Sequence, residues 1–194
     1  FSRMLNMHNI LQKQKNVISK NAEHLLNEQQ VAKAVYDNVA HSGCLDLPNL
    51  KFLLSPYSVF NGDVLLAARR PTGSVHILLG DFTGHGLPAA IGAMPLAEIF
   101  YGMTAKGFSM EDILREINSK LKTILPIGYF CCACMANLSF RKKTIEVWMG
   151  GLPDYYVLRK DQNEIEHIAS THLPLGVLSS QAFDATSQNI AFDV

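Results

Sequence analysis

Residues 78–90 read Leu78-Leu79-Gly80-Asp81-Phe82-Thr83-Gly84-His85-Gly86-Leu87-Pro88-Ala89-Ala90. An apolar strand pattern ends near an acid, Asp81, and then passes through a glycine-rich loop into an alanine-rich helix pattern. Glycines beside a carboxylate let backbone carbonyls turn toward a ligand, and oxygen ligands of this kind suit a hard cation that keeps bound waters. We therefore expect Asp81 to belong to a metal site.

A second acid has the same setting. Asp63 follows Gly62 at the start of a strand pattern, Asp63–Arg69, which a Pro- and Gly-containing turn separates from the next one, Val75–Leu79. If these strands form a hairpin, both carboxylates lie at its open end. Two carboxylates in one place repel each other, and a divalent metal is a common reason to tolerate this. The alternative is that each Asp merely caps a turn.

Other phosphate and nucleophile motifs fail on spacing. The loop after Gly80 has neither the Lys-Ser or Lys-Thr of a P-loop nor the glycine order of a dinucleotide fingerprint, and no Gly-x-Ser-x-Gly elbow occurs. A helix N-terminus near Leu87 remains a possible anion-binding position. His85 lies between two glycines, which favours a role in shaping the loop or orienting a ligand over a role as general base.

The remaining pattern groups strands and helices instead of alternating them, which predicts an α+β domain. Ser109 is expected to cap the second helix, and Pro95 is expected to kink or interrupt the first. The predicted strands are Lys51–Ser55, Tyr129–Leu138, Thr144–Met149, Tyr155–Arg159 and Ile165–Ile168, and the predicted helices are Leu87–Met103 and Ser109–Leu125; the last four strands are expected to form an antiparallel meander.

The first 39 residues contain no Gly or Pro and carry one apolar seam at an interval of seven, at Met4, Leu11, Ile18, Leu25, Ala32 and Val39. The companion seam is mixed, so any coiled-coil pairing would be weak or adjustable. We predict a helical linker over residues 1–40 that forms a homodimer, followed by a domain over residues 41–194. The alternative is a single helix that lies on the domain.

Composition bounds the function classes. Seventeen basic and seventeen acidic residues balance, which argues against a nucleic-acid partner. The apolar runs are shorter than the roughly 20 residues that span a bilayer, and the N-terminus has no signal-peptide pattern, so we expect no membrane association and a cytoplasmic location. Cys131, Cys132 and Cys134 crowd into one apolar stretch without a nearby His, which favours buried structural side chains over a zinc site.

The sequence from Gly80 to Ala90 resembles the signature of the SpoIIE and RsbU type of type 2C serine/threonine protein phosphatase. Asn61-Gly62-Asp63 is similar to the Gly-Gly-Asp segment of that family, and Leu173-Pro174-Leu175-Gly176 is similar to its Pro-Leu-Gly stretch. Met149-Gly150-Gly151-Leu152-Pro153 stands where the family has an Asn-Ala-Gly-His turn. The resemblance extends from about residue 28 to the C-terminus.

This resemblance implies an α-β-β-α sandwich of antiparallel sheets with flanking helices. It also implies two Mn²⁺ or Mg²⁺ ions bridged by Asp81, with Asp63 and the Phe82 carbonyl as further metal ligands, and a metal-activated water as nucleophile. The activity implied is that of a phosphoserine/phosphothreonine phosphatase, the output domain of a bacterial response regulator or partner-switching protein. The implied substrate is a phosphorylated antagonist of an anti-sigma factor.

Three departures from the family pattern keep an alternative open. Leu66 replaces a second Asp, Leu152 replaces the His, and the last metal-binding Asp of the family would follow Val194. We therefore expect the chain to be a C-terminally incomplete piece of a longer protein. The alternative function is a catalytically inactive pseudophosphatase that binds a sigma-factor regulator, and a third possibility is a dimerisation module built on the N-terminal helix.

Overall fold

The computed structural model describes residues 2–40, 43–48, 50–54, 62–84, 86–159 and 165–192. The chain divides into two compact units, Phe1–Asp37 and Asn38–Val194, and each is described by itself. The domain limits expected from the sequence, 1–40 and 41–194, stay a prediction.

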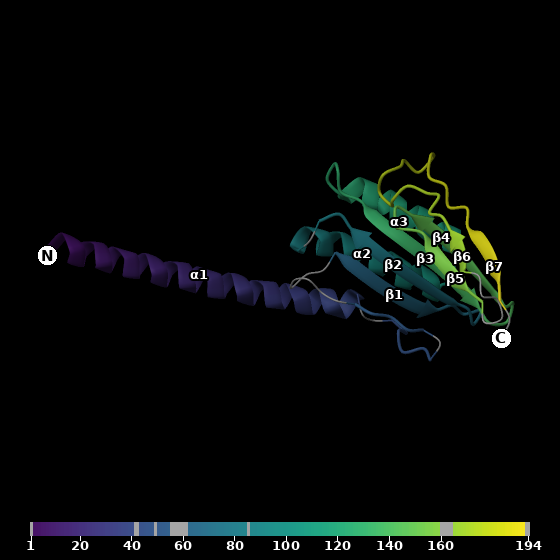
Figure 1. The fold of residues 1–194 in the computed structure, drawn as a ribbon, viewed down its shortest axis with the longest axis horizontal. Helices are drawn as coiled ribbons and strands as arrows, with labels where there is room; N and C mark the ends of the chain where they lie inside the picture. Colours follow the sequence, from purple (N-terminus) through teal and green to yellow (C-terminus); the bar gives the residue numbers. More distant parts are fainter. Residues whose placement is uncertain are drawn as a thin grey trace. The chain divides into compact units, whose positions relative to one another are not determined.

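The N-terminal segment forms one helix, α1 (Ser2–Ala40), as the absence of Gly and Pro predicts (Figure 1). Three residues of its apolar seam are exposed to solvent: Leu11 is 57%, Ile18 67% and Leu25 57% exposed. Among the described residues, no helix is both long enough and apolar enough to cross a membrane.

Within the described part of the second unit, the main sheet has five antiparallel strands in the order β1-β2-β3-β4-β7 (Figure 1). A separate two-stranded sheet pairs β5 with β6. The strands are β1 (Asp63–Arg69), β2 (Val75–Phe82), β3 (Cys131–Ser139), β4 (Thr144–Gly150), β5 (Tyr155–Leu158), β6 (Ile165–Ile168) and β7 (Gln188–Ala191).

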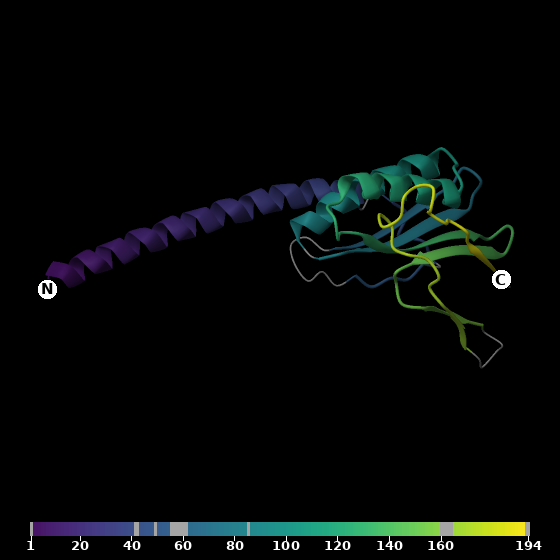
Figure 2. The ribbon, with the colours of Figure 1, turned by 90° about the horizontal axis from the view of Figure 1, so that it is seen from above.

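Two helices, α2 (Leu87–Ala105) and α3 (Met110–Ile124), cover one face of the main sheet, and the β5–β6 hairpin lies on its other side (Figure 2). As predicted, Ser109 caps α3: its hydroxyl oxygen accepts a hydrogen bond from the Asp112 backbone N–H at 3.1 Å. The core lies between helices and sheet and includes the fully buried side chains Leu66, Leu78, Leu96, Phe100, Ile113, Leu114, Ile117, Leu121, Met135 and Trp148. The predicted α+β class is confirmed.

Two strand predictions need correction. Strand β2 does not stop at Leu79 but continues to Phe82, because β3 pairs with it along its whole length, from Val75 opposite Leu138 to Phe82 opposite Cys131. The segment 51–54 is not a strand, and Leu53 is 91% exposed; Ser55 lies outside the described residues.

Two further differences concern α2 and the order of the strands. Of the two outcomes expected at Pro95, a kink or an interruption, the interruption does not occur; the buried side chains of α2 against the sheet offset the hydrogen bond that a helical proline loses. The meander breaks after β4, which pairs with the unpredicted β7 instead of β5. Strand β7 is four residues long and only one of its side chains is buried, so its own sequence carries little strand signal.

Candidate functional site

Asp63 and Asp81 lie directly opposite each other. The β1–β2 register pairs Asp63 with Asp81 and runs without a break to Arg69 and Val75 at the turn. Directly opposed residues of an antiparallel pair project to the same face with Cβ atoms about 4.5–5.5 Å apart. The predicted convergence of the two carboxylates at the open end of the hairpin is confirmed, and both residues are exposed to solvent.

The two acids interact electrostatically. The pKa of Asp81 is raised above its ordinary value, first by partial burial, then by the charge of Asp63 and by hydrogen bonding with the Asp63 side chain. The shift means that the charged form of Asp81 is less favourable beside Asp63 than it would be in water. A cation between the two carboxylates would remove the repulsion that raises this pKa.

The loop after Asp81 brings backbone oxygens to the same place. The Phe82 N–H donates to the Gly62 carbonyl at 3.1 Å. A Cβ atom at Gly62 would lie 3.0 Å from the Phe82 oxygen and 2.9 Å from the Gly84 oxygen, so only glycine permits this close approach. The Phe82 side chain is 3% exposed and packs in the core, which leaves its carbonyl as the group available to a ligand.

Thr83 anchors this loop to the start of β3, a role that the sequence analysis missed. Its hydroxyl donates to the Phe130 carbonyl at 2.8 Å and accepts from the Phe130 N–H at 2.7 Å, and its own N–H donates to the same carbonyl at 3.0 Å. A Thr directly after a predicted strand end is a local signal, but its partner, 47 residues away, is not.

Cys132 is a second neighbour of the pair that the sequence analysis did not identify. The β2–β3 register places Cys132 opposite Asp81, so Asp63, Asp81 and Cys132 form one row across three strands. All four cysteines are free thiols, and Cys131, on the opposite face of β3, is fully buried. The structural interpretation of the cysteines therefore fits Cys131 better than Cys132.

The donor set fits a hard dication in its chemistry. Two carboxylates and the Phe82 carbonyl are oxygen ligands of the kind that Mg²⁺ and Mn²⁺ prefer. In residues 62–84, 86–159 and the rest of the described chain, however, no group of three or more His, Cys, Asp or Glu side chains is arranged to hold a metal ion. Leu66 is fully buried on the opposite face of β1 from Asp63, so this position supplies no ligand.

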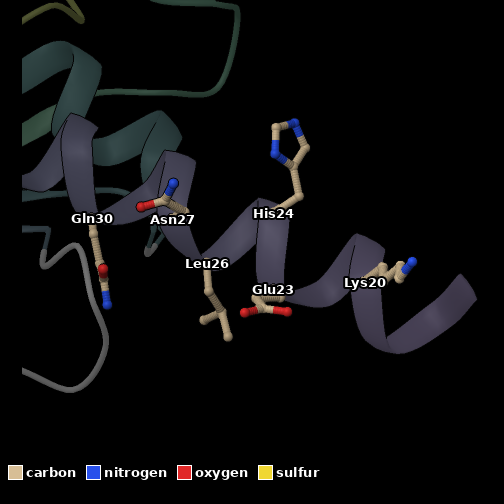
Figure 3. A pocket seen from close by; sticks show the side chains of 6 residues that line it. All are labelled: Lys20, Glu23, His24, Leu26, Asn27 and Gln30. Atoms are coloured by element: carbon tan, nitrogen blue, oxygen red, sulfur yellow. The ribbon is translucent and has the colours of Figure 1, made fainter. Parts of the chain in front are cut away.

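Asn61 and His85, two residues of the sequence motifs, lie outside the described residues. A shallow surface hollow of about 550 Å³ lies along α1, where the side chains of Lys20, Glu23, His24, Leu26, Asn27 and Gln30 leave the helix in different directions (Figure 3). Because a single exposed helix lines it, this hollow is not enclosed and offers no catalytic environment.

Comparison with known proteins agrees with this geometry. The family described as Stage II sporulation protein E (SpoIIE) matches residues 71–193, which is more than half of the chain. Among curated proteins, no sequence matches significantly.

Solved structures share the fold. The RsbU and RsbW domains of a Mycobacterium tuberculosis protein superpose with a TM-score of 0.60 at 18% identity, over 72% of this chain and 38% of that one. The SiaA-PP2C domain of Pseudomonas aeruginosa gives 0.67 at 16% identity, over 88% and 67%. The PP2C phosphatase domain of SpoIIE from Bacillus subtilis, with a fragment of its regulatory domain, gives 0.54 at 16% identity, over 68% and 38%.

The chain thus spans well under half of the first and third of these structures and about two thirds of the second. The family match, together with the shared fold, leads to one conclusion. This chain belongs to the SpoIIE family, and its fold is that of PP2C-type phosphatase domains.

Proposed function

We propose that the chain is the catalytic core of a metal-dependent phosphoserine/phosphothreonine protein phosphatase. The observation that carries the proposal is the opposed pair Asp63–Asp81 beside the Phe82 carbonyl. Two Mn²⁺ or Mg²⁺ ions, when bound, would supply a water of lowered pKa and neutralise charge on the phosphoryl group.

The residues of the chain have distinct parts in this proposal. Asp81 would help to hold the ions, the part that the family resemblance implies for it; it is the middle residue of the row, with Asp63 on one side and Cys132 on the other. Asp63 and the Phe82 carbonyl would complete the ligands that this chain contributes. Gly62 admits the loop carbonyls, and Thr83 holds the loop against Phe130.

We further propose that the substrate is a phosphorylated antagonist protein of the anti-anti-sigma type, and that the chain is the output domain of a bacterial partner-switching or response-regulator protein in the cytoplasm. Two proteins that share this fold, one with RsbU and RsbW domains and the other SiaA, support a signalling context of this kind. The free thiol state of all four cysteines suits a reducing compartment.

The test is manganese-dependent release of phosphate from a phosphoserine protein by the wild-type chain and by Asp81→Asn. We expect the substitution to lower the rate by about 10²–10³-fold, since a metal supplies several kcal/mol of transition-state stabilisation and each 1.36 kcal/mol is tenfold. Glu98→Gln, the same carboxylate-to-amide change at an exposed position of α2, is the matched control. Equal rates in wild type and Asp81→Asn would refute the enzyme proposal.

A catalytically inactive pseudophosphatase is the second candidate. It is favoured by the presence of only two acidic side chains in the row and by the buried Leu66. This candidate predicts binding of the phosphorylated partner without phosphate release, which a pull-down combined with the phosphate assay separates from the first proposal.

We also propose that α1 forms a homodimer through its seam, because Leu11, Ile18 and Leu25 repeat every seven residues and are more than half exposed. Ile18→Glu is expected to make the protein monomeric in sedimentation equilibrium, while Asn16→Glu, on the same helix but off the seam, is not. A wild-type monomer at high concentration would contradict the dimer.

A further inference from the structure

A loop formed by residues 172–184 closes on itself beside the candidate site. At one end the His172 ring lies 5.3 Å from the Trp148 ring, and at the other end the Trp148 indole N–H donates to the Asp184 carbonyl at 3.1 Å. The Phe183 ring also lies 5.7 Å from Trp148. A loop of this length with adjacent ends is an Ω-loop, a type that often carries function.

The middle of this loop is held by one buried amide. Asn118 of α3 is fully buried, and its Oδ1 accepts from the Gly176 N–H at 2.9 Å while its Nδ2 donates to the Leu178 carbonyl at 3.1 Å. Burying a side-chain amide is costly unless its groups are hydrogen-bonded, and these two partners of the Asn118 amide are backbone groups of the loop. The buried Asn118 therefore holds the loop in one register against α3.

Two sets of contacts connect Asn118 with the row formed by Asp63, Asp81 and Cys132. Leu175, next to Gly176, exchanges both backbone hydrogen bonds with Cys131, at 2.8 and 3.0 Å. Cys131 stands opposite Phe82, and the next residue of β3, Cys132, stands opposite Asp81. The position of Leu175 on the edge of the site is thereby set from α3.

Pro174 then meets the site itself. A Cβ atom placed on Gly151 would lie 2.5 Å from Pro174 Cγ and 2.9 Å from Cys132 Sγ. Pro174 and Cys132 therefore both lie directly against Gly151. We call Cys132, Gly151 and Pro174 the wall: it flanks Asp81 on the side away from Asp63.

We propose that Asn118 is a positioning residue that fixes this wall, through Gly176 and Leu175, and thereby sets where a phosphoprotein lies against Asp81. The last step rests on the proposed phosphatase function; the fixing of the wall does not. The two parts are therefore tested by separate measurements.

The first measurement is the rate at which a small thiol reagent labels Cys132 in the native full chain carrying Cys44→Ser, with each cysteine resolved by fragment mass spectrometry. In Asn118→Ala we expect Cys132 to be labelled about tenfold faster, the scale set by loss of a buried hydrogen-bonded group, while Cys134, further along β3, keeps its rate. Asn118→Ala removes a buried group and can lower overall stability. Pro174→Ala is therefore the second variant: Pro174 is only half-buried, and its truncation is expected to expose Cys132 in the same way.

The matched control is Lys122→Met, which removes an exposed hydrogen bond to the same loop, from Lys122 Nζ to the Val177 carbonyl at 3.0 Å. It is expected to change the rate by no more than about twofold, as for most surface substitutions. An unchanged Cys132 rate in Asn118→Ala would overturn the proposal, and an unchanged rate in Pro174→Ala would show that Pro174 does not shield Cys132. Equal acceleration of Cys131, Cys132 and Cys134 would overturn it too, because that pattern reports general unfolding.

The second measurement is the steady-state kinetics of manganese-dependent dephosphorylation. A displaced wall is expected to raise KM for the phosphoprotein in Asn118→Ala with kcat little changed, whereas a fall in kcat at constant KM would overturn the role in substrate positioning. If the wild-type chain releases no phosphate at all, the phosphatase proposal fails, and the labelling result still decides whether Asn118 fixes the wall.

Discussion

The two ends of β2 carry ionisable side chains in opposite settings. Asp81, near one end, is exposed and faces the like-charged Asp63; His76, near the other, is completely buried on the helix-facing side, where its Nδ1 lies 3.0 Å from the Thr104 hydroxyl. Burial is the largest cause of both pKa shifts, which raise the pKa of Asp81 and lower that of His76 to about 4.

The difference lies in what can reach each group. His76 has a cationic neighbour, Arg70, and among the described residues its Nε2 has no hydrogen-bond partner, so an imidazolium would have one acceptor at most. The neutral imidazole of His76, enclosed by the core, therefore contributes to packing. A carboxylate pair open to solvent can be reached by a metal ion. Burial therefore shifts the pKa of a structural group at one end of β2 and of a candidate metal ligand at the other.

The largest expected effect on stability is at the end of β2 that carries the buried His76. His76→Ala should lower the free energy of unfolding by about 3–4 kcal/mol, because it leaves a cavity and deprives the Thr104 hydroxyl of its partner. Asp81→Ala, in metal-free protein, should change it by about 0.5 kcal/mol or less, as for exposed positions. Urea unfolding of both variants measures this difference, and similar losses of unfolding free energy in the two variants would contradict the prediction.

The second prediction concerns acid. The pKa of His76 in the folded protein, about 4, lies below its ordinary value of 6.5, so between these values the unfolded chain binds a proton that the folded chain does not. The contribution to stability is complete above pH 6.5 and is lost as pH falls toward 4, up to about 3 kcal/mol. Unfolding free energies of wild type and His76→Leu across this range isolate the effect; parallel curves would mean that the His76 pKa is not lowered.

The third prediction is that a metal ion raises the unfolding free energy through the Asp81 end of β2 and not through the His76 end. Mn²⁺ at about 100 times its dissociation constant is expected to raise the unfolding free energy of the wild-type chain by about 2.7 kcal/mol. His76→Leu should retain this increment and Asp81→Asn should lose it, as thermal unfolding with and without Mn²⁺ can show. Retention in Asp81→Asn would place the metal elsewhere.

The smallest effect is expected from Thr104→Val, which keeps the shape of the side chain but removes the hydrogen bond to His76. We expect a loss of about 1–2 kcal/mol, without any change in Mn²⁺ binding measured by electron paramagnetic resonance. A change in metal binding would show that the two ends of β2 are coupled.

Local signals accounted for much of the fold. The turn from Arg70 to Ser74 closes the β1–β2 hairpin with hydrogen bonds from the Arg70 N–H to the Ser74 carbonyl at 2.8 Å and from the Gly73 N–H to the Arg70 carbonyl at 2.9 Å. Ser109 and the apolar spacing of α3 likewise marked its start and its buried face. These signals lie within a few residues of one another, which is why single-sequence patterns detect them.

Long-range pairing accounted for what the patterns missed. The end of β2 depends on β3, the place beside β4 is taken by β7 and not by β5, and the anchor of Thr83 is Phe130. Nothing near these residues in the chain specifies such partners, because contacts between distant segments depend on how the whole sheet and its helices pack.

The opposition of Asp63 and Asp81 therefore followed from the sequence by itself, since a short turn sets the register of a hairpin and thereby which residues face each other. The addition of Cys132 to the row, and the buried Asn118 that holds the loop beside it, arose from the folded chain. Both depend on contacts between segments that lie about 50 or more positions apart in the chain. Such contacts form only when tertiary packing compensates the entropy lost in bringing the segments together.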